Sequence, residues 1–290
     1  MNEQIKVSVI MGVHNQKDKQ ILLQAVDSIL DQSLRELEFI ICNDGSNQEV
    51  SEHLREIAKK DERIVLLESE NNRGLAFSLN RCIAVAKGKY IARMDDDDIS
   101  KVERLKIQYD FLESHKEYAW CGTNAELFGR QGVWGKRSMP VCPSDKDFLK
   151  FSPYVHPSVM YRAELFEVEG NYLNSEETLR CEDYEIFMRF HQKGYQGYNL
   201  QEELFLYREE PESFQKRKWI YRVNEAKIRY RNFKKMKLLF PMGWIYVIRP
   251  LAAMALPVKL IQMLKREKLE YRYGTTDRTH SILSEHVSSE

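Results

Sequence analysis

Apolar residues follow two different spacings along the first 130 residues of the chain. Short, almost continuous apolar runs, which are typical of strands buried on both faces, alternate with segments in which apolar residues recur every three or four positions, as in helices. The strands predicted in this way are Val7–Val13, Leu37–Cys42, Ile64–Leu67 and Tyr90–Met94, and the helices are Asp18–Asp31, Glu49–Lys60, Leu75–Ala86 and Lys101–Ser114. This alternation predicts an α/β fold in which helices flank a mostly parallel, Rossmann-like sheet.

The pattern loosens beyond residue 118, but no clear linker interrupts the chain before residue 210. Further elements are expected at Ala119–Phe128 (one or two strands), Val159–Tyr161 (a strand), Asp183–Lys193 (a helix) and Glu203–Tyr207 (an edge strand), with a loop-rich stretch over Gly129–Ser144. We therefore expect one domain over residues 1–214. A basic helical region over residues 215–273 and a polar, flexible tail over residues 274–290 would follow it.

The composition is that of a globular protein, since 43% of the 290 residues are apolar and 30% are charged. The five cysteines include no Cys-x-x-Cys pair, so a disulfide framework or a zinc site is not expected and a reducing compartment is favoured. The first apolar run is too short for the core of a signal peptide, and no cleavage site of small residues follows it. These features predict a cytoplasmic protein.

Four consecutive aspartates, Asp95 to Asp98, follow the apolar strand Tyr90–Met94. Adjacent like charges repel, so such a run needs a partner, and its hard oxygen ligands suit Mg²⁺ or Mn²⁺ together with the phosphates of a substrate. In open α/β sheets, ligands bind beyond the carboxyl ends of the strands, where this run lies. The alternative is an acidic cluster that interacts favourably with the dipole of the next helix.

Two further acidic positions allow a functional and a purely structural interpretation. Asp44, in the turn after the second strand, could accept a hydrogen bond from a base or a ribose, or it could cap the following helix. Glu182 and Asp183 open a helix, where a carboxylate could act as a general base or could merely suit the helix terminus. A lone histidine such as His156 is more often packed than catalytic. No glycine spacing of the Rossmann or P-loop type supports a nicotinamide or ATPase function.

Taken together, these positions resemble the pattern of glycosyltransferase family 2, whose members have the GT-A fold. The resemblance covers roughly residues 5–210. It rests on six segments in the same order, namely Val7–Asn15, Asn43–Ser46, Asn71–Ala76, Ala86–Asp98, His156–Met160 and Glu182–Phe190. One such segment would be a weak signal, whereas six with fitting spacing are a strong one.

The resemblance implies that the strand ends form a nucleotide-sugar site. Family residues that bind the nucleotide part match Val13, His14, Asn15, Asp44, Arg73, Gly74, Asp95 and Asp96. Asp44 would read uracil, and Asp95 and Asp96 would lie near the ribose. Asp97, assisted by Asp95, would bind Mn²⁺ or Mg²⁺, and Asp98 would be a supporting residue.

The resemblance also implies the reaction. Asp183 would be the general base, with Glu182 as its neighbour, so that an acceptor hydroxyl attacks the anomeric carbon in line and inverts its configuration. Two departures from the family pattern concern the nucleotide. The family usually has Pro and Tyr where Gly12 and His14 stand, and Asp where Asn43 stands. Base stacking would then involve an imidazole.

The C-terminal region differs in charge from the rest of the chain. Residues 215–273 carry 16 Lys and Arg against three Glu, whereas residues 1–214 carry 27 basic and 38 acidic side chains. Residues 238–264 are strongly apolar, but no uncharged stretch is long enough to span a bilayer, so helices in the plane of an anionic cytoplasmic leaflet are favoured. The alternative is a helical pair packed on the preceding domain. The long apolar block makes nucleic acid a poorer partner.

The sequence thus predicts an inverting, metal-dependent hexosyltransferase, peripheral on the inner face of the cell membrane. It would move a sugar from a UDP-sugar to a saccharide acceptor, lipid-linked by analogy with the family, during surface-polysaccharide synthesis. A sugar nucleotidyltransferase is one alternative, but the phosphate loop expected after its first strand is missing. A degenerate, non-catalytic sugar-nucleotide-binding protein is the other, and the retention of Asp44, Asp97 and Asp183 speaks against it.

Overall fold

The computed structural model describes residues 4–209 and 218–255. The strands are β1 (Val7–Val13), β2 (Leu37–Asp44), β3 (Ile64–Ser69), β4 (Tyr90–Arg93), β5 (Ile99–Ser100), β6 (Trp120–Gly129), β7 (Gly132–Arg137), β8 (Met160–Arg162) and β9 (Gly197–Arg208). The helices are α1 (Lys19–Leu30), α2 (Gln48–Ala58), α3 (Leu75–Val85), α4 (Arg104–Ser114), α5 (Glu164–Glu169), α6 (Glu182–Gln192), α7 (Trp219–Lys235) and α8 (Trp244–Ala255). Short helical turns lie at Asp145–Leu149, His156–Ser158 and Leu239–Gly243.

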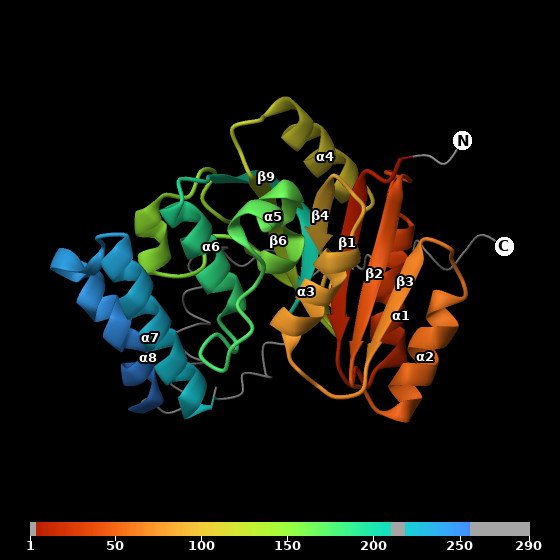
Figure 1. Cartoon of the computed structure of the whole chain (residues 1–290), viewed down its shortest axis with the longest axis horizontal. Coiled ribbons are helices and arrows are strands. Elements are labelled where there is room, and N and C mark those ends of the chain that lie inside the picture. Colours follow the sequence, from red (N-terminus) through yellow and green to blue (C-terminus); the bar gives the residue numbers. More distant parts are fainter. Residues whose placement is uncertain (1–3, 210–217, 256–290) are drawn as a thin grey trace.

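The strands form one sheet in the order β3-β2-β1-β4-β8-β6-β9-β5, with β7 paired to β6 (Figure 1). β1 lies parallel to both β2 and β4, in registers that place Val13 beside Asn43 and Ile10 beside Arg93. β2 also lies parallel to β3, whereas β8 pairs antiparallel with β4 and β6. The carboxyl ends of β1, β2 and β4 therefore lie at one edge of the sheet.

The alternation of side chains along β1 explains why the sheet has a core on each face. Successive side chains of a strand point to opposite faces. Val7, Val9 and Met11 pack into one core together with side chains of α1, α2 and α4. Ile10 packs into a second core with side chains of α3, α6 and α7. Helices therefore cover both faces of the sheet, as the apolar pattern predicted.

Local sequence explains where the first helices begin. The Asp18 side chain accepts hydrogen bonds from the backbone amides of Gln20 and Ile21 and so caps α1. Asn47 caps α2 in the same way, by accepting from the Val50 amide at 3.0 Å. The predicted bounds of these two helices were close to the observed ones, whereas α4 begins three residues later than predicted.

Of two predictions for the second half of the chain, one was incomplete and one was wrong. Residues 129–144 were expected to be loop-rich, but they also contain β7, which forms a hairpin with β6. Residues 203–207 were expected to form an edge strand. They belong instead to the longer β9, which lies between β6 and β5 inside the sheet. β6 is a single strand, and its register with β9 shifts at residues 123–125, which explains why its pattern suggested one strand or two.

α7 and α8 pack against the second core. Ile228 and Phe233 of α7 and Val247 of α8 are buried there together with side chains of α6. The described part of the region predicted over residues 215–273 is therefore helical and rests on the sheet domain, while the tail predicted over residues 274–290 lies outside the described residues. Within the described ranges, no helix combines the length and the apolar character needed to cross a bilayer.

Candidate active site

Three neighbouring parallel strands bring the predicted polar residues to one edge of the sheet. His14 follows β1, Asp44 ends β2, and Asp95 lies just beyond β4. The Met94 amide donates to the Ile10 carbonyl at 3.0 Å, which continues the pairing of β4 with β1 up to the first aspartate. The carboxyl edge of the parallel strands is where ligands bind in open α/β sheets. Residues far apart in the sequence therefore meet where a ligand is expected.

Asp44 is buried, with 3% of its surface exposed. Its two carboxylate oxygens accept hydrogen bonds from the backbone amides of Arg73 and Gly74, at 2.9 and 2.8 Å. A carboxylate can accept further hydrogen bonds beyond these two, so a donor such as the imide N–H of a base can share it. Asp44 does not cap the following helix, because Asn47 does. Asp44 therefore holds the loop of residues 71–74 against the strand end, a contact that the sequence did not predict.

The residues that follow β1 are fixed by hydrogen bonds to those that follow β2. His14 Nδ1–H donates to the carbonyl oxygen of Asp44 at 2.9 Å, which leaves Nε2 to accept from the Asn15 side chain at 3.1 Å. Asn15 has a φ of 51°, and its side-chain oxygen accepts from the Asn47 amide at 2.8 Å. Asparagine adopts this left-handed conformation more readily than most residues. The exposed imidazole is therefore held in place at the edge of the sheet.

A glycine after Asp44 allows the loop of residues 71–74 to approach the strand end. Gly45 has a φ of +63°, and a Cβ atom there would lie 2.4 Å from the backbone of that loop.

Gly132 has a φ of +99°, but a Cβ atom there would meet nothing within 4 Å. We expect Gly45→Ala to lower the free energy of unfolding by about 1–3 kcal/mol more than the control Gly132→Ala, because only the first overpacks. Urea denaturation of both variants measures this difference, and equal losses would contradict it.

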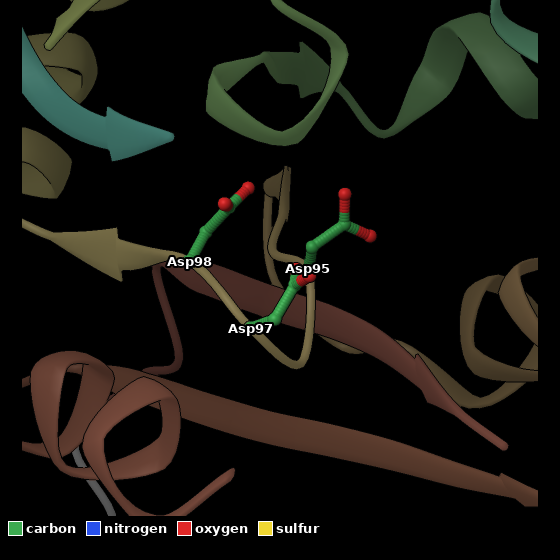
Figure 2. A group of neighbouring side chains, drawn as sticks. All are labelled: Asp95, Asp97 and Asp98. Atoms are coloured by element: carbon green, nitrogen blue, oxygen red, sulfur yellow. The ribbon is translucent and has the colours of Figure 1, made fainter. Parts of the chain in front are cut away.

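The aspartates after β4 form a compact acidic group. Carboxylate oxygens of Asp95, Asp97 and Asp98 lie within 4.8 Å of one another, on the loop that joins β4 to β5 (Figure 2). Burial raises the pKa of Asp97 to about 6 and that of Asp96 to about 8, and neighbouring carboxylates add to both shifts. Burial also raises the pKa of Asp98. Its buried Oδ2 has no hydrogen-bond partner among the described residues.

Two arginines neutralise part of this negative charge. Arg93 is buried and pairs with Asp95 at 2.5 Å. Burial has the largest single effect and would lower the pKa of Arg93. The charge and hydrogen bond of Asp95, together with Tyr172 and Asp98, outweigh it, so the pKa is raised. Arg208, at the end of β9, donates from its backbone amide to Asp98 Oδ1 at 2.7 Å and from Nε to the Asp97 carbonyl at 2.6 Å. The clustered oxygen donors of Asp95, Asp97 and Asp98 fit Mg²⁺ or Mn²⁺.

Sequence analysis missed both arginines. Arg93 left a signal, because a charged side chain within an otherwise apolar strand needs a buried partner. Arg208 left none, because 110 positions separate it from Asp98 and only the sheet brings them together. Asp98, predicted only to support the run, lies with the possible metal ligands, whereas Asp96 lies outside that group of three.

The start of α6 and the acidic loop both interact electrostatically with a buried tyrosine, Tyr172. Glu182 and Asp183 occupy the first turn of α6, where carboxylates interact favourably with the helix dipole. The Tyr172 hydroxyl lies 2.8 Å from His156 Nε2. Burial raises the pKa of Tyr172 to about 12, with contributions in the same direction from Asp183 and Asp95. Asp183 and Asp95 therefore both contribute to the electrostatic environment of one buried phenol.

Burial distinguishes Glu182 from Asp183 at the start of α6. Glu182 is buried, and burial raises its pKa, whereas Asp183 is partly exposed. A general base must reach the proton that it removes, so the geometry favours Asp183 over Glu182. His156 is buried as well, and burial keeps its pKa well below the usual value, so it packs as a neutral ring. This agrees with the sequence-based expectation that it is a packed residue.

The fold and the acidic edge define a glycosyltransferase of the GT-A type. Residues 8–189 match the profile of Glycosyl transferase family 2, and the chain belongs to this family. EpsE of Bacillus subtilis (strain 168), which is named a glycosyltransferase, is 35% identical over 271 residues, covering 93% of this chain and 96% of EpsE. The amylovoran biosynthesis glycosyltransferase AmsE of Erwinia amylovora is 28% identical over 265 residues, covering 89% and 97% of the two chains.

Solved structures with the same fold include two with bound nucleotides. TarS residues 1–349 of S. aureus, in complex with UDP, superposes with a TM-score of 0.63 at 16% identity, covering 88% of this chain and 76% of that one. The mannosyltransferase PcManGT of Pyrobaculum calidifontis, in complex with GDP-Man and Mn²⁺, has a TM-score of 0.58 at 16% identity, covering 94% and 82%. At these identities, the likeness establishes the fold. The predicted family, fold class and enzyme class are thus confirmed.

Proposed function

We propose that this glycosyltransferase moves a sugar from a UDP-sugar to a saccharide acceptor with inversion, in the synthesis of a surface polysaccharide. The observation that carries the proposal is the arrangement of Asp44 and the acidic loop at the carboxyl edge of the parallel strands β1, β2 and β4. The similarity to AmsE, the amylovoran biosynthesis glycosyltransferase, supports the polysaccharide part. We further propose that residues 1–214 form the catalytic domain.

The nucleotide would bind across the ends of β1 and β2. Val13, His14 and Asn15 would contact the base, and Asp44 would accept the imide N–H of uracil while it keeps its bonds to the 71–74 loop. That loop contributes Arg73 and Gly74. Guanine presents a different pattern of donors, so this arrangement favours UDP over GDP. The UDP complex of TarS supports the assignment.

Asp97 and Asp95 would hold a divalent cation, with Asp98 completing the group and Asp96 near the ribose. Asp98 Oδ2 is buried without a hydrogen-bond partner among the described residues, and burial together with Asp95 raises the pKa of Asp97, so a bound cation would stabilise both carboxylates. When bound, Mn²⁺ or Mg²⁺ would stabilise the negative charge that develops on the leaving diphosphate. Arg93 and Arg208 keep the acidic loop in a fixed shape through their bonds to Asp95 and Asp98.

Asp183 would accept the proton of the attacking acceptor hydroxyl. Its carboxylate lies at the start of a helix, which holds it in place for a nucleophile that approaches opposite the leaving group. Such a displacement inverts the anomeric carbon in one step, without a covalent sugar–enzyme intermediate. Glu182, which is buried beside it, would position this turn of the helix.

The acceptor would be lipid-linked, and the enzyme would act at the inner face of the cell membrane. The basic region over residues 215–273 supports this location through its charge and exposed apolar residues.

Calorimetric titration with UDP and GDP in the presence of Mn²⁺ tests the nucleotide assignment. We expect UDP to bind at least tenfold more tightly, because one hydrogen bond to a charged group contributes about 1.5–3 kcal/mol. Asp44→Asn should reduce this preference, with Asn47→Ser as the control, since serine can also cap α2. Equal affinity of the wild-type enzyme for both nucleotides would contradict the proposal. The configuration of the product, determined by NMR, tests the inversion.

A further inference from the structure

An exposed apolar surface runs along α8 and the turn before it. Its side chains are between 39% and 79% exposed and comprise Phe240, Met242, Trp244, Ile245 and Ile248. We call this surface the α8 face. Positions 244, 245 and 248 share one side of the helix. Val247 is buried among side chains of α6 and α7, so the α8 face is not what attaches the helix to the domain.

Lysines border the α8 face on its α7 side. The rings of Trp244 and Tyr230 lie 5.4 Å apart, which joins the exposed sides of the two helices. Lys227, Tyr230 and Lys234 are all exposed and recur at helical spacing along α7. Within the described part of the chain, neither lysine has a carboxylate close enough for an ion pair. Lys227 interacts electrostatically with Glu177, whose ion pair is with Arg231, so the ammonium groups of both lysines remain able to contact an outside partner.

A second basic group lies where α7 ends. A hollow of about 590 Å³ is lined there by Lys193, Lys235 and Lys237, among others. Neither Lys235 nor Lys237 forms an ion pair with the described residues. The turn that carries Phe240 follows directly. The most exposed side chain of the α8 face thus follows a lysine-rich hollow, which Asp145 also lines.

We propose that the α8 face inserts into the surface of an anionic phospholipid bilayer, with α7 and α8 lying in the plane of that surface. The apolar side chains would enter the boundary of the acyl chains, and Trp244 and Tyr230 would lie at the level of the head groups. Lys227 and Lys234 would contact the lipid phosphates. Lysine is depleted in protein–protein interfaces, so this combination fits a bilayer better than a second copy of the chain.

This surface is also connected to the candidate active site. Asn224 of α7 donates to the Glu176 carbonyl at 2.6 Å, and Arg231 of α7 pairs with Glu177. The segment that holds both glutamates continues into α6, which carries Asp183. Docking of α7 would therefore hold the acceptor side of the site close to the bilayer. This last step rests on the proposed function, whereas the docking itself does not.

Sedimentation with vesicles tests the docking on the full chain. Vesicles of phosphatidylcholine alone are compared with vesicles of equal parts phosphatidylcholine and phosphatidylglycerol. We expect the wild-type protein to bind only the anionic vesicles. Ile245→Ser with Ile248→Ser should weaken this binding at least tenfold, because two apolar side chains leave the acyl boundary. The matched control is Val133→Ser with Val168→Ser, since both valines are exposed on other elements.

Replacement of the lysines separates the electrostatic contribution to membrane binding from the apolar one. Lys227→Gln and Lys234→Gln should each weaken binding about fivefold, the usual effect of one lysine at an anionic surface. Unchanged binding of the isoleucine variant, or no binding by the wild type, would overturn the proposal. So would a dimer in light scattering that the isoleucine substitutions dissociate, because the α8 face would then join two copies. Transfer to a soluble acceptor is measured on the same samples, so loss of docking and loss of the proposed function are distinguished.

Discussion

Asp97→Ala is expected to abolish metal-dependent donor binding and to reduce transfer about 10³-fold, because a Lewis-acid metal contributes several kcal/mol to the stabilisation of a developing charge. Asp97 lies with Asp95 and Asp98 in the acidic loop, and its removal would take away one of three clustered oxygen ligands. Calorimetry with the donor and Mn²⁺ measures the binding, and initial rates measure the transfer.

Without metal, the same substitution is expected to leave the stability of the fold unchanged or to raise it, although it abolishes donor binding. The pKa of Asp97 is raised to about 6 in the folded protein, above its usual 3.8, so the ionised group destabilises the fold as the pH rises through 6. At pH 8, and without metal, Asp97→Ala should therefore unfold at the same temperature as the wild type or at a higher one. Asp110→Ala, an exposed aspartate on α4, is the control and should leave donor binding unchanged. Donor binding that survives Asp97→Ala would show that the metal is held elsewhere.

Asp183→Asn is expected to keep donor binding and to lose transfer about 10²–10⁴-fold, the usual contribution of a positioned general base. Asparagine has nearly the same shape and stays compatible with the first turn of α6, so the fold and the nucleotide site should be unaffected. A quenched-flow measurement of a single turnover isolates the chemical step from product release.

The control for this variant is Glu164→Gln, which also changes a carboxylate to an amide but lies on the exposed side of α5. Its transfer rate should equal that of the wild type. If Asp183→Asn transfers normally, the base is another residue, and Glu182 becomes the first one to test.

The first half of the fold could be predicted from the sequence because local pattern and tertiary position agree there. Val7–Val13 is buried on both faces, and its apolar run shows this directly. β9 was misjudged because its middle residues, Gln201 and Glu202, are exposed although the strand lies inside the sheet. A hairpin such as β6–β7 depends on pairing between neighbours, which residue composition alone indicates poorly.

The candidate site could be predicted only in part. The strand ends could be read from the sequence, because parallel strands place their carboxyl ends together. The bonds from Asp44 to the 71–74 loop, and from Arg208 to the acidic loop, join residues about 30 and 110 positions apart and depend on the folded sheet. The sequence did not indicate that Asp98 lies with the possible metal ligands, since the four aspartates are identical residues and only the conformation of the loop decides which of them come together.

Release of UDP by the wild-type enzyme tests the central claim most directly. The enzyme is incubated with a panel of UDP-sugars and saccharide acceptors, once with Mn²⁺ and once with EDTA. We predict turnover with at least one donor and acceptor in the presence of Mn²⁺, and loss of that turnover in EDTA. No turnover with any donor and a suitable acceptor, or equal rates with and without the metal, would contradict a metal-dependent transferase built on the aspartates that follow β4.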